Sequence, residues 1–361
     1  MKRIVMTGGG TAGHVTPNIA LMPALKAMGF EIYYIGSYDG IEKKLIEDIG
    51  IKYYGVSTGK FRRYFSLKNF TDPFRVFKGI SEARKILEQL SPDVVFSKGG
   101  FVSVPVVKGA KKLGIPCIIH ESDYSVGLAN KLCFSAAEKI CCDFPETLKT
   151  LPKGKGVLTG APVRKELSEG NAGNGRIVCG FEEGKPVIMV IGGSLGAAAV
   201  NKAVREALPE LLKTFNVIHI CGKGKTDKEF DNTEGYKQFE YVGRGLADLF
   251  AAADVVVSRA GANSVFELLA LKKPNILIPL PGGRGDQLLN ARSFESQDYS
   301  MVIRQEEVTT QLLVEKINEV YDNREKYIAR MSESKQQDAI AVITDMLKNA
   351  ADRAEKRQKN N

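Results

Sequence analysis

Histidine, closely spaced cysteine pairs and long apolar runs are scarce or missing in this chain of 361 residues. Only 3 histidines are present, and the 6 cysteines show no Cys-x-x-Cys spacing. The cysteines stand in apolar, strand-like stretches, which favours free core thiols over disulfides or a metal site. No apolar run is as long as a membrane-spanning helix, which needs about 18 residues. The N-terminus begins with a strand-like run and shows no signal-peptide pattern. We therefore expect a cytoplasmic chain that is neither exported nor inserted across a bilayer.

The composition is that of an ordinary globular protein, with 43% hydrophobic and 26% charged residues. Its length fits two α/β domains. The net charge of +9 admits three kinds of partner: nucleic acid, an anionic membrane surface or an anionic small molecule. Nucleic acid is disfavoured because no helix-turn-helix, RNA-binding or zinc-finger signature accompanies the basic residues.

Aromatic and basic side chains alternate within residues 60–85. This mixture is typical of an interfacial contact with anionic lipid heads. The alternative is an amphipathic helix whose aromatic face belongs to the core. The residues concerned are Phe61, Arg62, Arg63, Tyr64, Phe65, Leu67, Lys68, Phe70, Phe74, Arg75, Val76, Phe77 and Lys78.

Two glycine-rich turns, each directly after an apolar run, occupy matching places in the two halves of the chain. They are KRIVMTGGGTAGH at 2–14 and PVIMVIGGSLGA at 186–197. Glycines at such a place let backbone amides approach a phosphate at the following helix N-terminus, and Thr11 and Ser194 can donate to an oxyanion. The first turn lacks the G-x-G-x-x-G pattern and its acidic partner, so a nicotinamide enzyme is disfavoured.

Strand-like runs alternate with helical stretches in both halves, which predicts parallel sheets covered by helices. The runs are RIVMTG, EIYYIG, KYYGVS, DVVFSKGG, PCIIHE, KICCD and GVLTG, then VIMVIGG, NVIHICG, FEYVG, DVVVSRAG, NILIPL and MVIRQ. The Gly- and Asn-rich stretch at 160–175 is predicted to be the linker. We expect an N-terminal domain over 1–162, a C-terminal domain over 163–345 and a frayed, charged tail over 346–361.

A further turn, Gly261–Ser264, lies between a predicted strand and helix in SRAGANSVFELLALKKPNILIPLP at 258–281. Glu267 is expected in the first turn of that helix, where its carboxylate could accept hydrogen bonds from a ribose diol. The alternative is a capping box, because Ser264 and Glu267 match S-x-x-E.

These motifs together resemble the MurG family of bacterial glucosaminyltransferases that act in peptidoglycan synthesis. The resemblance covers nearly the whole chain, with motifs in the family's order. They are GGGTAGHVTP (8–17), SKGGFVSVP (97–105), HESDYSVGLANKL (120–132), GAPVR (160–164), GGSLGA (192–197), SRAGANSVFELLA (258–270) and GDQLLNA (285–291).

The resemblance implies the GT-B fold, in which two Rossmann-like domains with parallel sheets face a deep cleft. It implies an inverting transfer of GlcNAc from UDP-GlcNAc to the C4 hydroxyl of undecaprenyl-pyrophosphoryl-MurNAc-pentapeptide, without a cofactor. The acceptor would bind the N-terminal domain and the nucleotide mainly the C-terminal one. The enzyme would act as a peripheral protein at an anionic membrane surface, on the cytoplasmic face of the cell membrane.

Individual roles are also implied by the resemblance. On the nucleotide side, the phosphates would be held by Ser194 and by the turn formed by Ala262, Asn263 and Ser264. Glu267 would bind the ribose, Val242 would lie at the uracil, and Arg164 would help to bind the nucleotide. Gln287 and Asn290 would meet sugar hydroxyls. In the N-terminal domain, Thr11, Ala12 and Gly13 would line the cleft and Asn130 would reach the donor sugar, while His14, His120 and Glu121 would handle the acceptor and catalysis. Phe101, Ser122, Asp123 and Leu195 depart from residues that many relatives carry.

The chemistry sets two needs: the departing diphosphate must be neutralised and the acceptor hydroxyl must lose a proton. The chain has no Asp-x-Asp pair to hold a metal ion. Helix N-termini and glycine-turn amides would therefore neutralise the diphosphate, and no metal is expected. His14, which closes the first glycine turn, is our preferred base, with His120 and Glu121 as a supporting pair and His219 as a core residue.

Three other functions fit parts of the pattern. A diacylglycerol glycosyltransferase of similar fold would be expected to carry a longer lipid-binding insertion in its N-terminal half. A UDP-GlcNAc epimerase shares the two-domain architecture but needs no acceptor. A non-catalytic sensor of sugar nucleotides would need no base.

Overall fold

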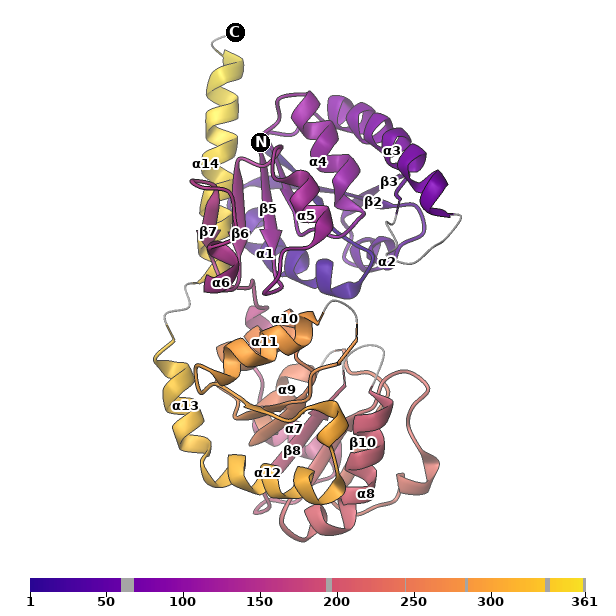
Figure 1. Cartoon of the computed structure of the whole chain (residues 1–361), viewed down its shortest axis with the longest axis vertical. Helices are drawn as coiled ribbons and strands as arrows, with labels where there is room; N and C mark the ends of the chain where they lie inside the picture. The colour runs from indigo at the N-terminus through magenta and orange to yellow at the C-terminus, as the bar shows by residue number, and fades with distance from the viewer. Residues whose placement is uncertain (60–67, 193–196, 244, 283–284, 335–337, 360–361) are drawn as a thin grey trace. The chain divides into compact units, whose positions relative to one another are not determined.

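The computed structural model describes residues 1–59, 68–192, 197–243, 245–282, 285–334 and 338–359 (Figure 1). The chain divides into two compact units. Unit 1 comprises Met1–Pro162 and Gln336–Asn361, and unit 2 comprises Val163–Lys335. The chain therefore leaves unit 1, forms unit 2 and returns to unit 1.

Unit 1 is built on a seven-stranded sheet in the order β3-β2-β1-β4-β5-β6-β7, with every neighbouring pair parallel. Its strands are β1 (Lys2–Thr7), β2 (Phe30–Ser37), β3 (Lys52–Val56), β4 (Val94–Ser97), β5 (Cys117–Glu121), β6 (Lys139–Cys142) and β7 (Gly156–Leu158). Its helices are η1 (Ala12–His14), α1 (Thr16–Ala27), α2 (Ile41–Glu47), α3 (Lys68–Leu90), α4 (Ser103–Lys112), α5 (Leu128–Cys133), α6 (Pro145–Leu148) and α14 (Ala339–Lys359).

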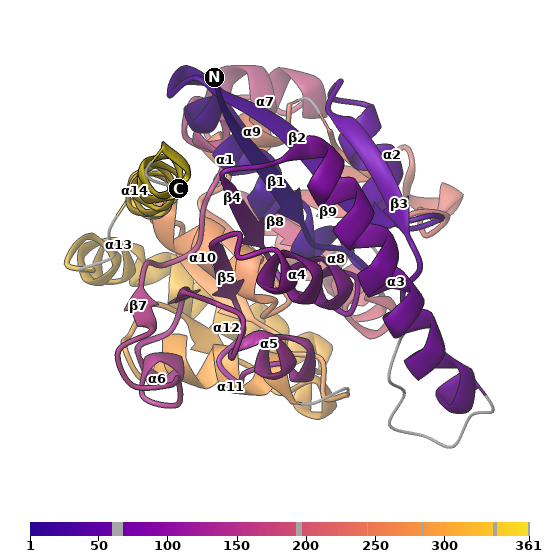
Figure 2. The same cartoon turned by 90° about the horizontal axis from the view of Figure 1, so that it is seen from above.

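Both faces of this sheet are covered, as expected for a buried parallel sheet. Alternate residues of β1 enter different cores, because successive strand side chains point to opposite faces. Ile4 and Met6 pack with α1 and α14, whereas Val5 packs with α3 and α4 (Figure 2). The continuous apolar runs in the sequence reflect this two-sided burial.

Helix α14 corrects two predicted bounds: it belongs to unit 1, so the C-terminal domain does not extend to 345, and the described residues from 346 to 359 form a helix and not a frayed tail. Its apolar side, which includes Ile343 and Leu347, is buried in the core of unit 1. Ion pairs of Asp352 with Lys2 and of Arg353 with Glu138 tie its charged half to the same unit. The abundance of charge reflects the solvent-facing side of an amphipathic helix.

Unit 2 has a six-stranded parallel sheet in the order β10-β9-β8-β11-β12-β13. Its strands are β8 (Val187–Ile191), β9 (Asn216–Ile220), β10 (Tyr236–Phe239), β11 (Val255–Ser258), β12 (Asn275–Leu277) and β13 (Met301–Val302). Its helices are η2 (Lys165–Ser168), α7 (Ala172–Cys179), α8 (Ala198–Thr214), η3 (Lys228–Phe230), α9 (Leu246–Ala252), α10 (Ala262–Ala270), α11 (Asp286–Glu295), η4 (Gln305–Glu307), α12 (Thr310–Asp322) and α13 (Arg324–Ser332).

Two details of unit 2 differ from the sequence prediction. The stretch predicted as a linker contains α7, whose start is capped by the Asn171 side chain and whose end has Gly180 in the left-handed region at φ 71°. The run FEYVG overlaps β10 only at Phe239, so Val242 lies in the following loop. The α/β class and the parallel sheets in both halves are confirmed.

The strand order of each sheet reverses direction at one place, between β1 and β4 in unit 1 and between β8 and β11 in unit 2. Ligands of doubly wound sheets bind at the carboxyl ends of the strands that flank such a place. The motifs at 8–17 and 97–105 follow β1 and β4, and those at 192–197 and 258–270 follow β8 and β11. Four of the recognised motifs therefore mark the two expected ligand positions.

The burial of α14 generates a stability prediction. Leu347→Ala should lower the free energy of unfolding of unit 1 by about 2–5 kcal/mol, because it leaves a cavity in a packed core. Lys348→Ala, on the exposed side of the same helix, is the matched control and should change it by no more than about 0.5 kcal/mol. Urea denaturation followed by circular dichroism measures both, and equal effects would contradict the docking of α14.

Candidate functional site

The first glycine turn of unit 1 connects β1 to η1 and α1. Thr11 and Gly13 are exposed, and Ala12 and His14 are half-buried. The backbone N–H groups of His14 and Val15 donate to the carbonyls of Thr11 and Ala12, which forms the short η1 helix. Pro17 in the first turn of α1 fits a helix start, since that position needs no intrahelical N–H. The turn thus places residues 11–14 at the carboxyl end of β1.

A buried carboxylate that the sequence analysis missed, Glu42 of α2, holds this turn in place. Its Oε2 accepts a hydrogen bond from the Gly10 N–H at 3.1 Å, and its Oε1 accepts from the Ser37 N–H at 3.1 Å and from the Ser37 hydroxyl. A Cβ at Gly9 or Gly40 would lie 2.5 Å or less from Glu42 side-chain atoms. These glycines leave room for the carboxylate that binds the turn to the end of β2.

The second glycine turn of unit 1 follows β4 and touches the first. Gly99 and Gly100 adopt φ of 90° and 79°, a region that favours glycine. A Cβ at Gly100 would lie 2.4 Å from the Gly9 carbonyl oxygen and 3.0 Å from Cδ2 of His14. Only a glycine backbone allows the two turns to approach this closely.

A buried polar cluster lies at the ends of β4, β5 and β6. The Lys98 Nζ contacts Nδ1 of His120 at 2.7 Å and donates to the Ser122 hydroxyl. The other ring nitrogen of His120 lies 3.0 Å from Oδ1 of Asp143 and 3.4 Å from the Gly160 carbonyl. Burial lowers the pKa of Lys98, while the charges of Asp143 and Glu121 act in the opposite direction.

Glu121 and Asn130, two of the predicted site residues, join this cluster. The Glu121 carboxylate accepts from the Gly127 N–H and the Asn130 side-chain amide, both at 2.9 Å, and from the Asp123 N–H at 3.2 Å. Asn130 also donates to the His120 carbonyl at 3.1 Å. The structure thus brings His120, Glu121 and Asn130 together, all three buried within unit 1.

Helix α10 of unit 2 begins one turn earlier than the capping box requires. Its N-cap is Gly261, so Ala262, Asn263 and Ser264 form the first turn and Glu267 lies in the second. The prediction that Glu267 is in the first turn is wrong, and the capping-box alternative is excluded because Ser264 is not the N-cap residue. The role of Glu267 therefore needs another explanation.

Glu267 faces Arg164 within unit 2, with 3.4 Å between Oε1 and the guanidinium Nη2. Burial raises the pKa of Glu267, and the Arg164 charge opposes that rise. Both side chains remain partly accessible. A half-buried carboxylate with a loosely placed cation beside the start of α10 is suited to accept hydrogen bonds from a polar ligand.

The other predicted residues of unit 2 have different surroundings. Gln287 accepts from the Leu280 N–H at 2.9 Å, and the fully buried Asn290 donates to the Ala260 carbonyl at 3.1 Å, directly before α10. Val242 is half-buried in the loop after β10. Ser194 and Leu195 lie outside the described residues.

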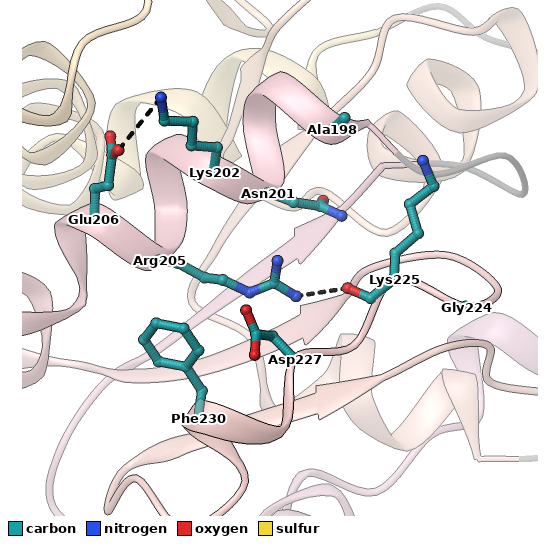
Figure 3. A pocket seen from close by; sticks show the side chains of 9 residues that line it. All are labelled: Ala198, Asn201, Lys202, Arg205, Glu206, Gly224, Lys225, Asp227 and Phe230. Carbon is teal, nitrogen blue, oxygen red and sulfur yellow. Dashed lines mark hydrogen bonds and ion pairs between the residues drawn. The ribbon is translucent and has the colours of Figure 1, made fainter.

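A separate surface pocket of about 490 Å³ lies beside α8 (Figure 3). Arg205 crosses it and donates to the Lys225 carbonyl at 2.6 Å. His219 lies close behind, where Nδ1 contacts the Tyr236 hydroxyl at 2.8 Å and Nε2 contacts Oδ1 of Asn201 at 3.1 Å. His219 is 0% exposed, which confirms the prediction that it is a core residue, and this burial lowers its pKa to about 3.

The aromatic and basic segment is described only from Lys68 onward, and its side chains only from Phe74. Phe74 and Phe77 of α3 are 76% and 72% exposed, and Arg75 and Lys78 are also exposed. These two rings therefore do not belong to the core. Arg62, Arg63 and the other residues before Lys68 lie outside the described part. No helix in the described ranges is long and apolar enough to cross a membrane.

The 6 cysteines are all buried free thiols, as predicted. Burial raises their pKa values. In the described part of the chain, no group of three or more His, Cys, Asp or Glu side chains could hold a metal ion.

Comparison with known proteins places the chain in a family. Residues 4–142 match the glycosyltransferase family 28 N-terminal domain, and residues 187–347 match the C-terminal domain of that family. The chain belongs to glycosyltransferase family 28. Each of the two matched regions begins within the first strand of its unit, at β1 or β8, so the family assignment covers both pairs of glycine-containing motifs.

Two bacterial relatives within the family are similar over almost the full length. They come from Lachnoclostridium phytofermentans, 60% identical over 349 residues (96% of this chain, 98% of the relative), and from Lachnospira eligens, 58% identical over 350 residues (96% and 99%). Both are named UDP-N-acetylglucosamine–N-acetylmuramyl-(pentapeptide) pyrophosphoryl-undecaprenol N-acetylglucosamine transferase.

Solved structures share the fold. The crystal structure of Acinetobacter baumannii MurG has a TM-score of 0.76 at 24% identity, with 97% of this chain and all of that chain covered. A glycosyltransferase of kitacinnamycin has a TM-score of 0.74 at 15% identity, with 96% and 98% covered. At these identities the likeness shows the fold alone.

The surroundings of Glu42 generate a second prediction. Glu42→Gln should lower the free energy of unfolding by about 1–3 kcal/mol, because an amide turns one donor toward the N–H of Gly10 or Ser37. Glu47→Gln, which removes the same charge from the exposed side of α2, is the control. Thermal denaturation compares the two, and a Glu42→Gln protein as stable as the control would show that the carboxylate does not hold the turn.

Proposed function

We propose that this chain is an inverting glycosyltransferase that moves N-acetylglucosamine from UDP-N-acetylglucosamine to the C4 hydroxyl of MurNAc-pentapeptide linked to undecaprenyl diphosphate. The observation that carries the proposal is the 60% identity, over 96% of the chain, to a relative named for this transfer. The fold supports it, since glycine-containing segments of the sequence follow the two strands at the reversal point of each sheet.

Unit 2 would bind the donor. Ala262–Ser264 form the first turn of α10, where the positive end of the helix dipole favours a diphosphate. The Glu267 carboxylate would accept hydrogen bonds from both ribose hydroxyls, and its ion pair with Arg164 would orient it. Val242 would lie beside the uracil and Ser194 beside the phosphates. Gln287 would meet a sugar hydroxyl, and Asn290 would support the Ala260 carbonyl before the turn.

Unit 1 would bind the acceptor and supply the base. Thr11, Ala12 and Gly13 would line its side of the site, and His14 would take the proton of the C4 hydroxyl as the donor sugar's anomeric bond breaks and the nucleotide diphosphate leaves. His14 fits this role because its ring is half-buried at the end of the first glycine turn. Glu121 and Asn130 would shape the loop that follows β5.

The enzyme would work on a membrane surface, because its acceptor is a lipid. Phe74 and Phe77 would insert among lipid heads while Arg75 and Lys78 attract anionic lipid. The sequence of residues 60–73 carries the same mixture of aromatic and basic residues. The reaction would take place on the cytoplasmic face of the cell membrane.

The function is tested by incubating the protein with radiolabelled UDP-GlcNAc, with and without vesicles that carry the muramoyl-pentapeptide lipid. Butanol-extractable label is expected only with this acceptor and without added metal ion. Label in diacylglycerol instead would identify a glycolipid synthase. Release of UDP with an epimerised sugar and no acceptor would identify an epimerase, and either outcome would overturn the proposal.

Donor binding by unit 2 gives a third prediction. Glu267→Ala should weaken UDP binding by about 1.5–3 kcal/mol, the value of hydrogen bonds to a charged group. Titration calorimetry with UDP measures this, and Glu295→Ala, an exposed carboxylate on α11, is the control. Unchanged affinity in the folded Glu267 variant would remove the ribose contact from the proposal.

Membrane contact gives a fourth prediction. Replacing Phe74 and Phe77 with Ser should weaken binding to anionic vesicles by at least about tenfold, since partial burial of two rings contributes roughly 1.5 kcal/mol or more. The matched control replaces Ile177 and Val178, which are exposed on unit 2, with Ser. Vesicle co-sedimentation compares them, and equal binding by both variants would exclude α3 from the membrane contact.

A further inference from the structure

Lys98 is a cation with almost no access to water, at 1% exposure, directly after β4. Its ammonium contacts Nδ1 of His120 and the Ser122 hydroxyl. A buried charge is costly unless other groups compensate it. Three carboxylates act on Lys98. Asp143 directly follows β6, Glu121 is the last residue of β5, and Asp123 lies in the segment after β5.

The contact with Lys98 determines which nitrogen of His120 carries the proton. An ammonium group donates hydrogen bonds and accepts none, so Nδ1 at 2.7 Å must be the acceptor. The ring proton is then on Nε2, which faces Oδ1 of Asp143 at 3.0 Å and the Gly160 carbonyl at 3.4 Å. Both nitrogens of His120 are therefore engaged by groups of the protein itself.

Asp143 depends on the same arrangement. Neither of its buried carboxylate oxygens makes a hydrogen bond of good geometry within the described residues. The Nε2–H of His120, with the Lys98 charge on the other side of the ring, is the compensation at hand for this carboxylate. Lys98, His120 and Asp143 thus form one chain of contacts across the ends of β4, β5 and β6.

This arrangement makes His120 unsuitable as the base. The ring is 0% exposed, so it cannot reach an acceptor hydroxyl without a rearrangement of unit 1. His120 can act only through the backbone that surrounds it.

The buried cluster and His14 lie on opposite sides of the Gly99–Gly100 turn. Lys98 is followed by the Gly99–Gly100 turn, and a Cβ at Gly100 would lie 3.0 Å from Cδ2 of His14. A Cβ at Gly99 would lie 3.1 Å from the Asn130 amide, which in turn donates to the His120 carbonyl. The turn is therefore fixed on one side by the buried cluster and contacts the His14 ring on the other.

We propose that Lys98 is a positioning residue for His14, and that it acts by locking His120 between its own ammonium and Asp143 beneath the Gly99–Gly100 turn. This inference rests on the proposed transferase function. It assigns the proton transfer to His14 and gives His120 a supporting role that requires hydrogen bonding but no change of protonation.

The decisive test uses amides, which reproduce the hydrogen bonds of His120 but cannot take a proton. In His120→Asn the side-chain oxygen can accept from Lys98, and in His120→Gln the side-chain nitrogen can donate toward Asp143. At least one of the two should keep kcat within about tenfold of the unaltered enzyme. His120→Leu, which makes neither bond, should lose more than about 10²-fold, and His14→Gln about 10²–10⁴-fold, the range for loss of a general base.

A double-mutant cycle tests Lys98 itself. Lys98→Met and Asp143→Leu each leave one buried charge without its partner and should each lower Tm by about 10 °C. The double variant should recover most of that loss, because both charges are gone. Lys98→Met should also lower kcat at least tenfold, calculated per folded protein with the folded fraction taken from the denaturation curves, and with little change in the KM for UDP-GlcNAc.

The outcomes separate the inference from the function on which it rests. If the unaltered protein transfers no label to the muramoyl lipid, the proposed function fails. If it does transfer label but both amide variants are folded and as inactive as His14→Gln, His120 is the base and the inference is overturned. Additive Tm losses in the double variant, or an unchanged kcat in folded Lys98→Met, would also overturn it.

Discussion

The close approach of two glycine turns at the reversal point of the unit 1 sheet constrains everything around it. A Cβ at Gly100 would come within 2.4 Å of the Gly9 carbonyl, so the β1 and β4 turns meet through their backbones. Contact between backbones alone does not fix the conformation of such turns. Buried polar groups on each side hold them in one conformation. Glu42 fixes the β1 turn from the direction of β2, and Lys98 lies beneath the β4 turn. The predicted reactive group, His14, lies where these two supports converge.

The two units place glycine-containing segments at corresponding strand ends but support the following turns differently. In unit 1 the supports are charged and buried, namely Glu42, Lys98 and Asp143. In unit 2 the turn before α10 is supported by neutral Asn290, and its charged groups, Arg164 and Glu267, remain partly accessible. Accessible charges are available to a ligand, whereas buried ones are occupied by the protein. This difference suits the roles proposed for the two units, namely donor binding by unit 2 and the positioning of a base by unit 1.

The sequence alone predicts the strands well, because a parallel strand buried on both faces must be a continuous apolar run, as in Val187–Ile191. The glycine turns are also predicted from local sequence, because their glycines directly follow these apolar runs. Prediction from the sequence fails where the partner is distant in the chain. Nothing local to Leu347 tells which core it enters, and nothing near Glu42 points to Gly10 as its donor. Lys98 and Asp143 are 45 positions apart and meet only because β4, β5 and β6 are neighbours.

The return of α14 to unit 1 makes unit 2 an insertion between the first 162 residues and the last helix of the same unit. Translation proceeds from the N-terminus, so the whole of unit 2 emerges before Ile343 and Leu347 can cover the core around Ile4 and Met6. Until then that face of the β1 and β4 strands has no cover from α14. Unit 2 can therefore complete its core before unit 1 does, although unit 1 is begun first. A segment synthesised after unit 2 therefore closes the core that contains β1.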